Sequence, residues 1–262
     1  MTDTYLAEMI SVARAAGQVA LTYRKQVTTM EVGFKGQADL ICEADSAVET
    51  SIKSQLSAIS ADIAYQGEEL GKSGPMNAEM SWLVDPIDGT TNFLSGLPFV
   101  ISIALVRGDD PISGVIYDPL ADEMYAATKG GGAHLNGKPI RVREQPDVAR
   151  LVVGTGLPLD AHVHSRGAYD RLHDIREAVA AVRIVGTCAL SLAYVASARL
   201  DGYFEGPTGF IDCAAGHLLV TEAGGVVSDY WGEPNQSTNW MTIAGAPACH
   251  AFLQRATSKA PR

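Results

Sequence analysis

The chain has 262 residues, which is enough to bury a large core, and 47% of them are hydrophobic, which indicates a globular fold. Its formal net charge is −10 and its pI is near 5.0. Nucleic acids and anionic membranes attract clustered Lys and Arg, so this balance argues against both as partners. An anionic substrate would need a local positive charge, such as a metal ion.

The N-terminal residues do not have the pattern of a secretory signal. Asp3 and Glu8 lie near its start with no basic cluster before an apolar core, so no secretory leader is expected. The longest apolar runs, such as Phe99–Val106, are too short to span a bilayer. The cysteines form no Cys-x-x-Cys pair, which favours buried reduced thiols over a zinc or redox site: Cys42, Cys188, Cys213 and Cys249. We expect a cytoplasmic protein.

Hydrophobic spacing predicts helices first and strands after them. Leu6 to Ala20 and Glu43 to Ile59 show helical periodicity. Short apolar segments separated by Gly, Pro and Asp predict strands at Asp62–Gln66, Ser81–Val84, Val100–Val106, Ile112–Tyr117 and Glu123–Ala127. The glycine-rich segment Lys129–Gly137 lacks the Gly-Lys-Ser/Thr ending of a P-loop, and a tight hairpin explains it better.

Strands and helices alternate beyond Arg150. The predicted strands are Leu151–Val153, Ile184–Val185, Gly202–Glu205 and Val226–Asp229, and the predicted helices are Tyr169–Ala181, Ala189–Ala198 and Asp212–Glu222. No repeat or linker is visible. The chain therefore reads as a layered α/β protein with a single domain over residues 1–262.

The segment Trp82–Phe93 has the clearest chemistry. Asp85 follows an apolar run, Pro86 fixes its own φ, and Gly89 permits a sharp bend. Asp85 and Asp88 are therefore expected close together. Like charges that close raise each other's pKa or require a cation, and carboxylates suit Mg²⁺, Mn²⁺ or Ca²⁺ better than Zn²⁺. Asp-Pro and Asp-Gly steps are also common in ordinary turns, so taken alone the segment also fits a plain loop.

Two further acidic groups support the metal interpretation. Glu68 and Glu69 end another short apolar run, and Asp212 lies where a helix is expected to begin. By contrast, His162 and His164 alternate like strand ligands but have no third ligand nearby, and we do not expect a site there.

Together these segments resemble the inositol monophosphatase family of Mg²⁺-dependent, lithium-sensitive-type phosphatases. The resemblance spans nearly the whole chain and depends on Asp85–Phe93, Gly67–Glu69, Asp212–Gly216 and Glu222–Gly225, with support from Asp39–Asp45, Lys129–Gly137 and Gly186–Cys188. It implies an αβαβα sandwich of the sugar-phosphatase type and a homodimer.

The resemblance also implies a site with two or three Mg²⁺ ions. Glu68, Asp85 and the main-chain carbonyl of Ile87 would hold the first ion. Asp85, Asp88 and Asp212 would hold the second, with Asp85 bridging the two, while Glu69 would be auxiliary. A pair of such ions about 4 Å apart can activate water and neutralise a phosphoryl group.

The resemblance assigns the remaining site residues to proton transfer and substrate binding. Thr90 and Asp45 would form a relay that orients or deprotonates the attacking water. The phosphate would lie on the N–H groups of Gly89 and Thr90. Polyol or phosphate oxygens would meet residues at a predicted helix start and a strand end: Gly186, Thr187, Cys188 and Glu205, beside Ile87, Asp88 and Asp212.

The expected reaction is hydrolysis of a small polyol phosphate, first of all inositol monophosphate. Histidinol phosphate, fructose 1,6-bisphosphate and 3′-phosphonucleotides remain alternatives, as does a regulatory binding protein on the same fold. Two departures from the family pattern bear on this choice. Ile211 replaces a common Trp beside Asp212, which predicts a roomier pocket, and Cys42 replaces a common hydroxyl residue.

Overall fold

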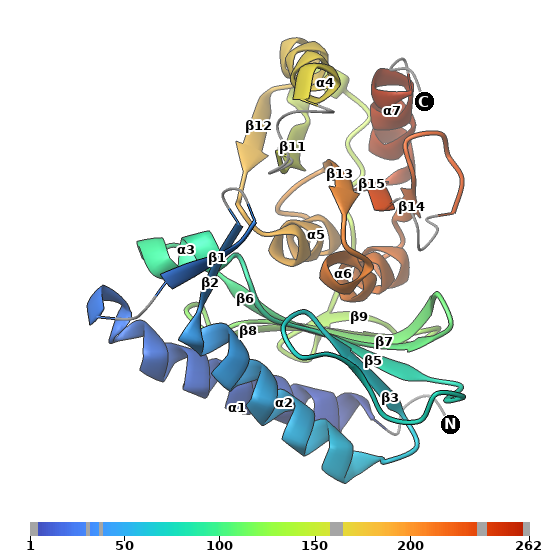
Figure 1. The fold of residues 1–262 in the computed structure, drawn as a ribbon. Helices are drawn as coiled ribbons and strands as arrows, with labels where there is room; N and C mark the ends of the chain where they lie inside the picture. Colours follow the sequence, from blue (N-terminus) through green and yellow to red (C-terminus); the bar gives the residue numbers. More distant parts are fainter. Residues whose placement is uncertain (1–4, 30–31, 37–38, 158–164, 235–239, 259–262) are drawn as a thin grey trace.

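The computed structural model describes residues 5–29, 32–36, 39–157, 165–234 and 240–258. Helices and sheets alternate in five layers, as the family resemblance predicted (Figure 1). The outer helices α1 (Leu6–Arg24) and α2 (Glu43–Ile59) cover one face of an eight-stranded sheet. The helices α5 (Cys188–Ala196) and α6 (Phe210–Glu222) separate this sheet from a five-stranded one. The last layer contains α4 (Ser165–Ala178) and α7 (Pro247–Thr257).

The two large sheets differ in strand direction. The eight-stranded sheet has the order β10-β9-β8-β7-β6-β5-β3-β4 and is antiparallel except where β3 pairs with β5. Its strands are β3 (Ala64–Gly67), β4 (Gly71–Ser73), β5 (Ser81–Asp88), β6 (Val100–Arg107), β7 (Asp110–Asp118), β8 (Glu123–Thr128), β9 (Gly132–Leu135) and β10 (Lys138–Ile140). The five-stranded sheet has the order β12-β11-β13-β15-β14 and is mixed. Its strands are β11 (Val152–Thr155), β12 (Ala181–Ile184), β13 (Gly202–Thr208), β14 (Val226–Ser228) and β15 (Trp240–Gly245).

The remaining elements are short. A hairpin of β1 (Val32–Gly36) and β2 (Asp39–Cys42) precedes α2, and α3 (Thr90–Ser95) follows β5. Two single 3₁₀ turns lie at Val27–Thr29 and Val148–Arg150. None of the helices in the described ranges is long and apolar enough to cross a membrane.

The middle helical layer is apolar on all sides because a sheet or a helix covers each face. Small residues bring its two helices close: a Cβ on Gly216 of α6 would lie 2.5 Å from the Leu192 side chain of α5. A Cβ on Gly114 of β7 would lie 3.0 Å from the backbone of Ala215. This close packing fixes where both helices begin, and both begin at the site described below.

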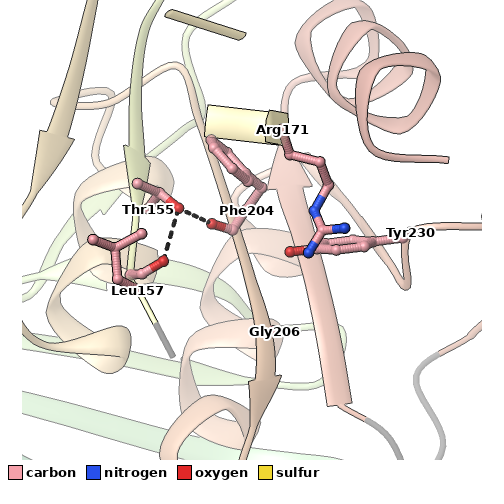
Figure 2. A pocket seen from close by; sticks show the side chains of 7 residues that line it. Thr155, Leu157, Arg171, Phe204, Gly206 and Tyr230 are labelled. Atoms are coloured by element: carbon pink, nitrogen blue, oxygen red, sulfur yellow. Dashed lines mark hydrogen bonds between the residues drawn. The ribbon is translucent and has the colours of Figure 1, made fainter. Parts of the chain in front are cut away.

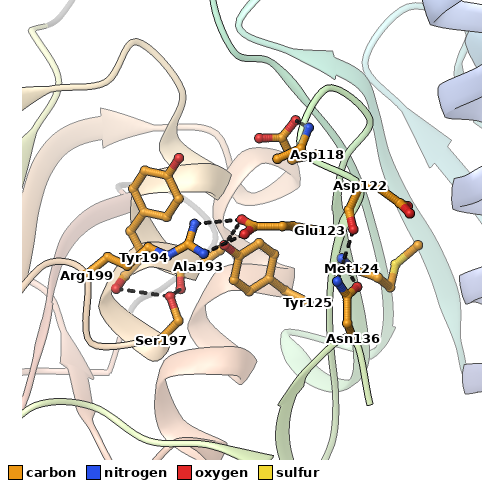
Figure 3. Close-up of polar contacts among 11 residues, drawn as sticks. Asp118, Asp122, Glu123, Met124, Tyr125, Asn136, Ala193, Tyr194, Ser197 and Arg199 are labelled. Atoms are coloured by element: carbon orange, nitrogen blue, oxygen red, sulfur yellow. Dashed lines mark hydrogen bonds and ion pairs between the residues drawn. The ribbon is translucent and has the colours of Figure 1, made fainter. Parts of the chain in front are cut away.

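A polar cluster ties the middle layer to the eight-stranded sheet (Figure 3). Arg199, which follows α5, makes two hydrogen bonds of 2.6 and 2.5 Å to the Glu123 carboxylate at the start of β8. Tyr125 donates its hydroxyl to the same carboxylate over 2.8 Å, and Arg199 also lies over the Tyr194 ring. Paired donors of this kind fix geometry as well as adding stability.

Several sequence predictions need correction. The helix expected to end at Ala181 ends at Ala178, and Ala181 begins β12 instead. The sequence did not predict β1, β2, β4, β15 or α7. The His162–His164 segment lies outside the described residues.

Arg141 and Arg143 alternate with Val142 in the sequence, which predicts a solvated charge at both arginines, but Arg143 differs. Its Nε and Nη2 donate to the Asp201 carboxylate over 2.7 and 2.8 Å. The Asp201 side chain is 0% exposed and also accepts the Val152 N–H. Arg143 therefore neutralises a buried charge that lies beside the first strand of the five-stranded sheet.

We expect Arg143→Met to lower the free energy of unfolding by about 1 to 3 kcal/mol, because it leaves the Asp201 carboxylate buried without its cation. Urea titration followed by circular dichroism measures this change. The matched control is Arg141→Met, which removes an exposed arginine two positions away and should have little effect. Equal losses in the two variants would contradict the role given to Arg143.

His217 on α6 gives a second prediction. Burial lowers the pKa of its imidazole from 6.5 to about 3, and the ring contacts the Thr242 hydroxyl at 3.0 Å. Below pH 6.5 the unfolded chain therefore binds a proton that the folded protein excludes, so this residue reduces stability as the pH falls from 6.5 towards 3. Between pH 7 and pH 5, wild type should lose roughly 2 kcal/mol more than His217→Gln in urea titrations. A pH-independent difference between the two proteins would overturn the assignment.

Candidate active site

A bulge in β5 places Asp85 and Asp88 on the same face of the sheet. Asp85 pairs with Ser102 of β6 and Asp88 with Val100, so three steps along β5 match two along its partner. Side chains three positions apart normally point to opposite faces of a strand, and the extra residue corrects this. Pro86 lies within the bulge, where its missing N–H removes no regular ladder bond. The predicted proximity of the two carboxylates thus has a backbone cause.

The turn after the bulge is held by local hydrogen bonds. The Ile87 N–H donates to Asp85 Oδ1 over 3.0 Å, and the Thr90 hydroxyl approaches the Ile87 carbonyl at 3.4 Å. Gly89 has a φ of 96°, which a residue with a side chain adopts only under strain. A Cβ there would also lie 3.1 Å from the Gly186 carbonyl oxygen.

Glu68 reaches this turn because β3 and β5 are parallel neighbours, so their carboxyl ends meet at one edge. The Glu68 N–H donates to the Val84 carbonyl over 3.1 Å, and the Glu68 and Asp85 carboxyls hydrogen-bond to each other. Glu69, the next residue, is only partly exposed, whereas Glu68 is exposed.

Asp212 comes from the middle helical layer and Glu205 from the five-stranded sheet. Asp212 lies in the first turn of α6 and accepts the Gly209 N–H over 3.1 Å. Glu205 lies on β13 and accepts the Tyr203 hydroxyl. A Cβ on Gly156 would lie 1.6 Å from Glu205 Oε1, so the glycine provides the space that this carboxyl occupies.

The pKa values show that these acids act on one another. Burial, followed by the charges of Glu68, Asp88 and Asp212, raises the pKa of Asp85 well above its usual range. Burial raises the pKa of Asp88 to about 7, with a smaller contribution from the Glu68 charge. Burial and the charges of Asp88 and Asp212 raise the pKa of Glu205 to about 8. The structure therefore brings together the acids that the sequence predicted from separate segments.

The donor set fits a hard divalent cation. Every charged group that shifts the pKa of Asp85, Asp88 or Glu205 is another carboxylate, so a cation would relieve repulsion at all three. The ligands are oxygens, which Mg²⁺ prefers. Within the described ranges, no three His, Cys, Asp or Glu side chains already form an arrangement that could hold an ion. The carboxylates would therefore have to turn towards one, starting with Asp85 and Glu68, which bond to each other.

The predicted contact between Thr90 and Asp45 is present. Thr90 donates its hydroxyl to Asp45 Oδ1 over 3.2 Å. Asp45 is fully buried near the start of α2, where Oδ2 accepts the Cys42 N–H over 2.8 Å. The Cys42 thiol also donates to Oδ2, over 3.0 Å, so this cysteine makes the kind of bond a hydroxyl residue would make. The sequence also left open that Asp45 is an exposed acid on a helix, and its burial excludes this alternative.

Gly186, Thr187 and Cys188 lie against the same turn. The sequence predicted a substrate oxygen as their partner, and in the structure the groups at this helix start bond to Asp88. Thr187 caps α5, and the Ala189 N–H donates to Asp88 Oδ2 over 2.7 Å. The Cys188 N–H and the Thr187 hydroxyl also hydrogen-bond to Asp88. The predicted helix start exists, and the groups expected to meet a substrate oxygen fix the orientation of Asp88.

A small cavity lies beside the five-stranded sheet (Figure 2). Its wall contains the backbone of Gly156 and Gly206 together with Thr155, Leu157, Arg171, Phe204 and Tyr230. Arg171 of α4 lies over the Tyr230 ring, 5.1 Å from its centroid. Sequence reasoning assigned no role to this cavity.

Asn92 received no role from the sequence, but it bridges two segments of the candidate site. Its buried amide donates to the Pro98 and Val185 carbonyls, each over 2.8 Å. It thereby joins α3, which follows the acidic turn, to the segment that leads into α5. The only sequence signal is an amide in a short helix directly after a Gly-Thr-Thr turn.

Comparison with known proteins decides the family. The family model described as "Inositol monophosphatase family" matches residues 1–262. The chain belongs to the inositol monophosphatase family. It is thus a phosphoric monoester hydrolase from a family of metal-dependent enzymes, with the layered fold of that family.

Individual relatives agree with this family assignment. The inositol-1-monophosphatase of Mesorhizobium japonicum is 38% identical over 96% of this chain and 95% of its own length. A protein of Escherichia coli K12 named "Nus factor SuhB" is 35% identical over 91% of this chain and 90% of its own. The solved inositol monophosphatase of Anabaena sp. PCC 7120 superposes with a TM-score of 0.86 at 32% identity, covering 98% of this chain and 96% of that one.

In this inositol monophosphatase family member, we expect Asn92→Ala to lower kcat about tenfold or more, because the turn and the start of α5 lose their shared donor and small displacements of reacting groups are costly. Phosphate release measures the rate, and thermal unfolding monitors the fold. Thr91→Ala is the control, since Thr91 is exposed in the same helix. A normal rate in Asn92→Ala would show that the two segments stay aligned without the amide.

Proposed function

We propose that this protein hydrolyses a small polyol phosphate, most readily inositol monophosphate, with Mg²⁺. The observation that carries the proposal is the convergence of Asp85, Asp88, Glu68 and Asp212, acids from three separate segments. The charges of Glu68, Asp88 and Asp212 raise the pKa of Asp85, and the charge of Glu68 raises that of Asp88. The inositol-1-monophosphatase among the relatives supports the choice of substrate.

The carboxylates divide between two ion positions. Glu68, Asp85 and the Ile87 carbonyl would hold the first Mg²⁺, while Asp85, Asp88 and Asp212 would hold the second. A third ion would lie beside Glu68. Bound Mg²⁺ supplies the positive charge that offsets the phosphate and makes water a better nucleophile.

The chain's own residues orient water and substrate. Thr90 Oγ1 accepts a proton from the attacking water as its own proton moves towards Asp45 Oδ1, along a hydrogen bond that is already formed. Gly89 and Thr90 present N–H groups to the phosphate. Glu205 accepts hydroxyl groups of the polyol, held in place by Tyr203. Gly186, Thr187 and Cys188 line the same side of the substrate position and fix Asp88.

We also propose that the chain is one cytoplasmic catalytic domain over residues 1–262 that forms a homodimer and binds no nucleic acid. A regulatory binding role is the second candidate, because one relative carries the name "Nus factor SuhB". A protein with that role alone would not need the acidic site, and the acids here are complete.

The test is a phosphate-release screen with Mg²⁺ over inositol monophosphates, histidinol phosphate, fructose 1,6-bisphosphate and 3′-phosphoadenosine 5′-phosphate. We expect inositol monophosphate to give the highest kcat/KM. Asp88→Asn should show no measurable turnover and a smaller rise of Tm on adding Mg²⁺, because one ligand charge is lost. Asp109→Asn, which neutralises an exposed acid far along the chain, is the control.

Two outcomes would overturn the proposal. Undiminished turnover in Asp88→Asn would sink the metal assignment. Absence of phosphate release from every compound by folded wild type would favour the binding role.

A further inference from the structure

Helix α2 carries two fully buried acids one turn apart. Asp45 and Glu49 are both 0% exposed and, four residues apart, lie on the same helical face. Asp45 meets Thr90 after β5. Glu49 has no part in the mechanism described above, although burying a carboxylate is costly unless its oxygens are satisfied.

The Glu49 carboxylate is satisfied by the turn that follows Glu68. Its Oε2 accepts the Glu69 N–H over 2.7 Å, and its Oε1 accepts the Leu70 N–H over 3.0 Å. Oε1 also accepts the Tyr65 hydroxyl over 3.1 Å. Both oxygens of one side chain thus bind consecutive amides directly after Glu68.

Gly67 confirms how closely the carboxylate fits. A Cβ at this position would lie 1.7 Å from Glu49 Oε1, so only glycine leaves room for the acid beneath the strand end. Two different elements therefore hold the backbone at Glu68 and directly after it. The Glu68 N–H is bonded to Val84 of β5, and the next two amides are bonded to Glu49 of α2.

We propose that Glu49 is a positioning residue for the ion-binding acid Glu68, so that α2 sets the distance between Glu68 and the Asp85–Thr90 turn. Asp45 fixes one side of that distance and Glu49 the other, and both are on one rigid helix. This inference rests on the proposed role of Glu68. It assigns Glu49 no contact with substrate or with an ion.

Glu49→Gln tests the inference directly. Glutamine has one oxygen and one NH₂ group, and the NH₂ group cannot accept a hydrogen bond from a backbone N–H. Whichever way the amide is turned, either the Glu69 or the Leu70 N–H loses its acceptor, while the side-chain volume stays the same. We expect the Mg²⁺ concentration for half-maximal activity to rise about tenfold, the size typical of groups that orient metal ligands. At saturating Mg²⁺, kcat should recover and KM for inositol monophosphate should be unchanged.

Tyr65→Phe is the matched control. It removes the third hydrogen bond to the same carboxylate and leaves both turn bonds in place. It should lower Tm without changing the Mg²⁺ requirement. The rise of Tm with added Mg²⁺, measured without substrate, gives a second readout for both variants that does not depend on turnover.

If Glu49→Gln does not fold, Gly67→Ala displaces the carboxylate from the opposite side and should raise the Mg²⁺ requirement in the same direction. The inference fails if a folded Glu49→Gln protein needs no more Mg²⁺ than wild type, or if Tyr65→Phe shifts the requirement equally. Failure of the proposed function looks different: wild type itself would then show no response to Mg²⁺, and the inference would fall with it.

Discussion

Mutual repulsion among carboxylates is the constraint on which the rest of this structure depends. The charge of Glu68 raises the pKa of both Asp85 and Asp88, the charge of Asp88 adds to the shift of Asp85, and both aspartates are buried. A flexible loop would relieve this repulsion by moving the acids apart. Here each acid is attached to backbone that cannot move independently: a bulged central strand, and a turn bonded to that strand. The packing of the sheet edge thus keeps the repelling carboxylates together, which favours binding of a cation.

The helical layers keep this arrangement in place. Helix α2 bonds to the turn after β5 through Asp45 and to the turn after β3 through Glu49. From the other side, α5 directs an amide at Asp88, and its own position follows from the close contact of Gly216 with Leu192. Packing of the helices therefore affects the position of the acids through these hydrogen bonds.

The sequence predicted most of the site acids because each has a local signature. Asp85, Asp88 and Glu68 follow apolar runs at strand ends, and Asp212 begins a helix, so spacing and turn residues reveal them. Glu49 and Asn92 have no such signature, since the partners of Glu49 are 16 to 21 residues away along the chain and Val185, the distant partner of Asn92, is 93 away. The sequence predicts a solvated charge at Arg143 for the same reason: its partner Asp201 is 58 residues away along the chain. The fold class follows from periodicity, whereas short strands such as β4 depend on sheet partners that a sequence does not display.

The proposed site takes its acids from two different sheets. Glu68, Asp85 and Asp88 belong to the eight-stranded sheet, and their spacing is fixed by α2 and α5. Glu205 and the cavity beside Arg171 and Tyr230 belong to the five-stranded sheet and its outer helix. The two groups are not independent, because α5 and α6 lie between the sheets and the charges of Asp88 and Asp212 raise the pKa of Glu205. Under the proposed function, a variant at Glu205 would therefore change both the contact to the alcohol and the charge balance around Asp88.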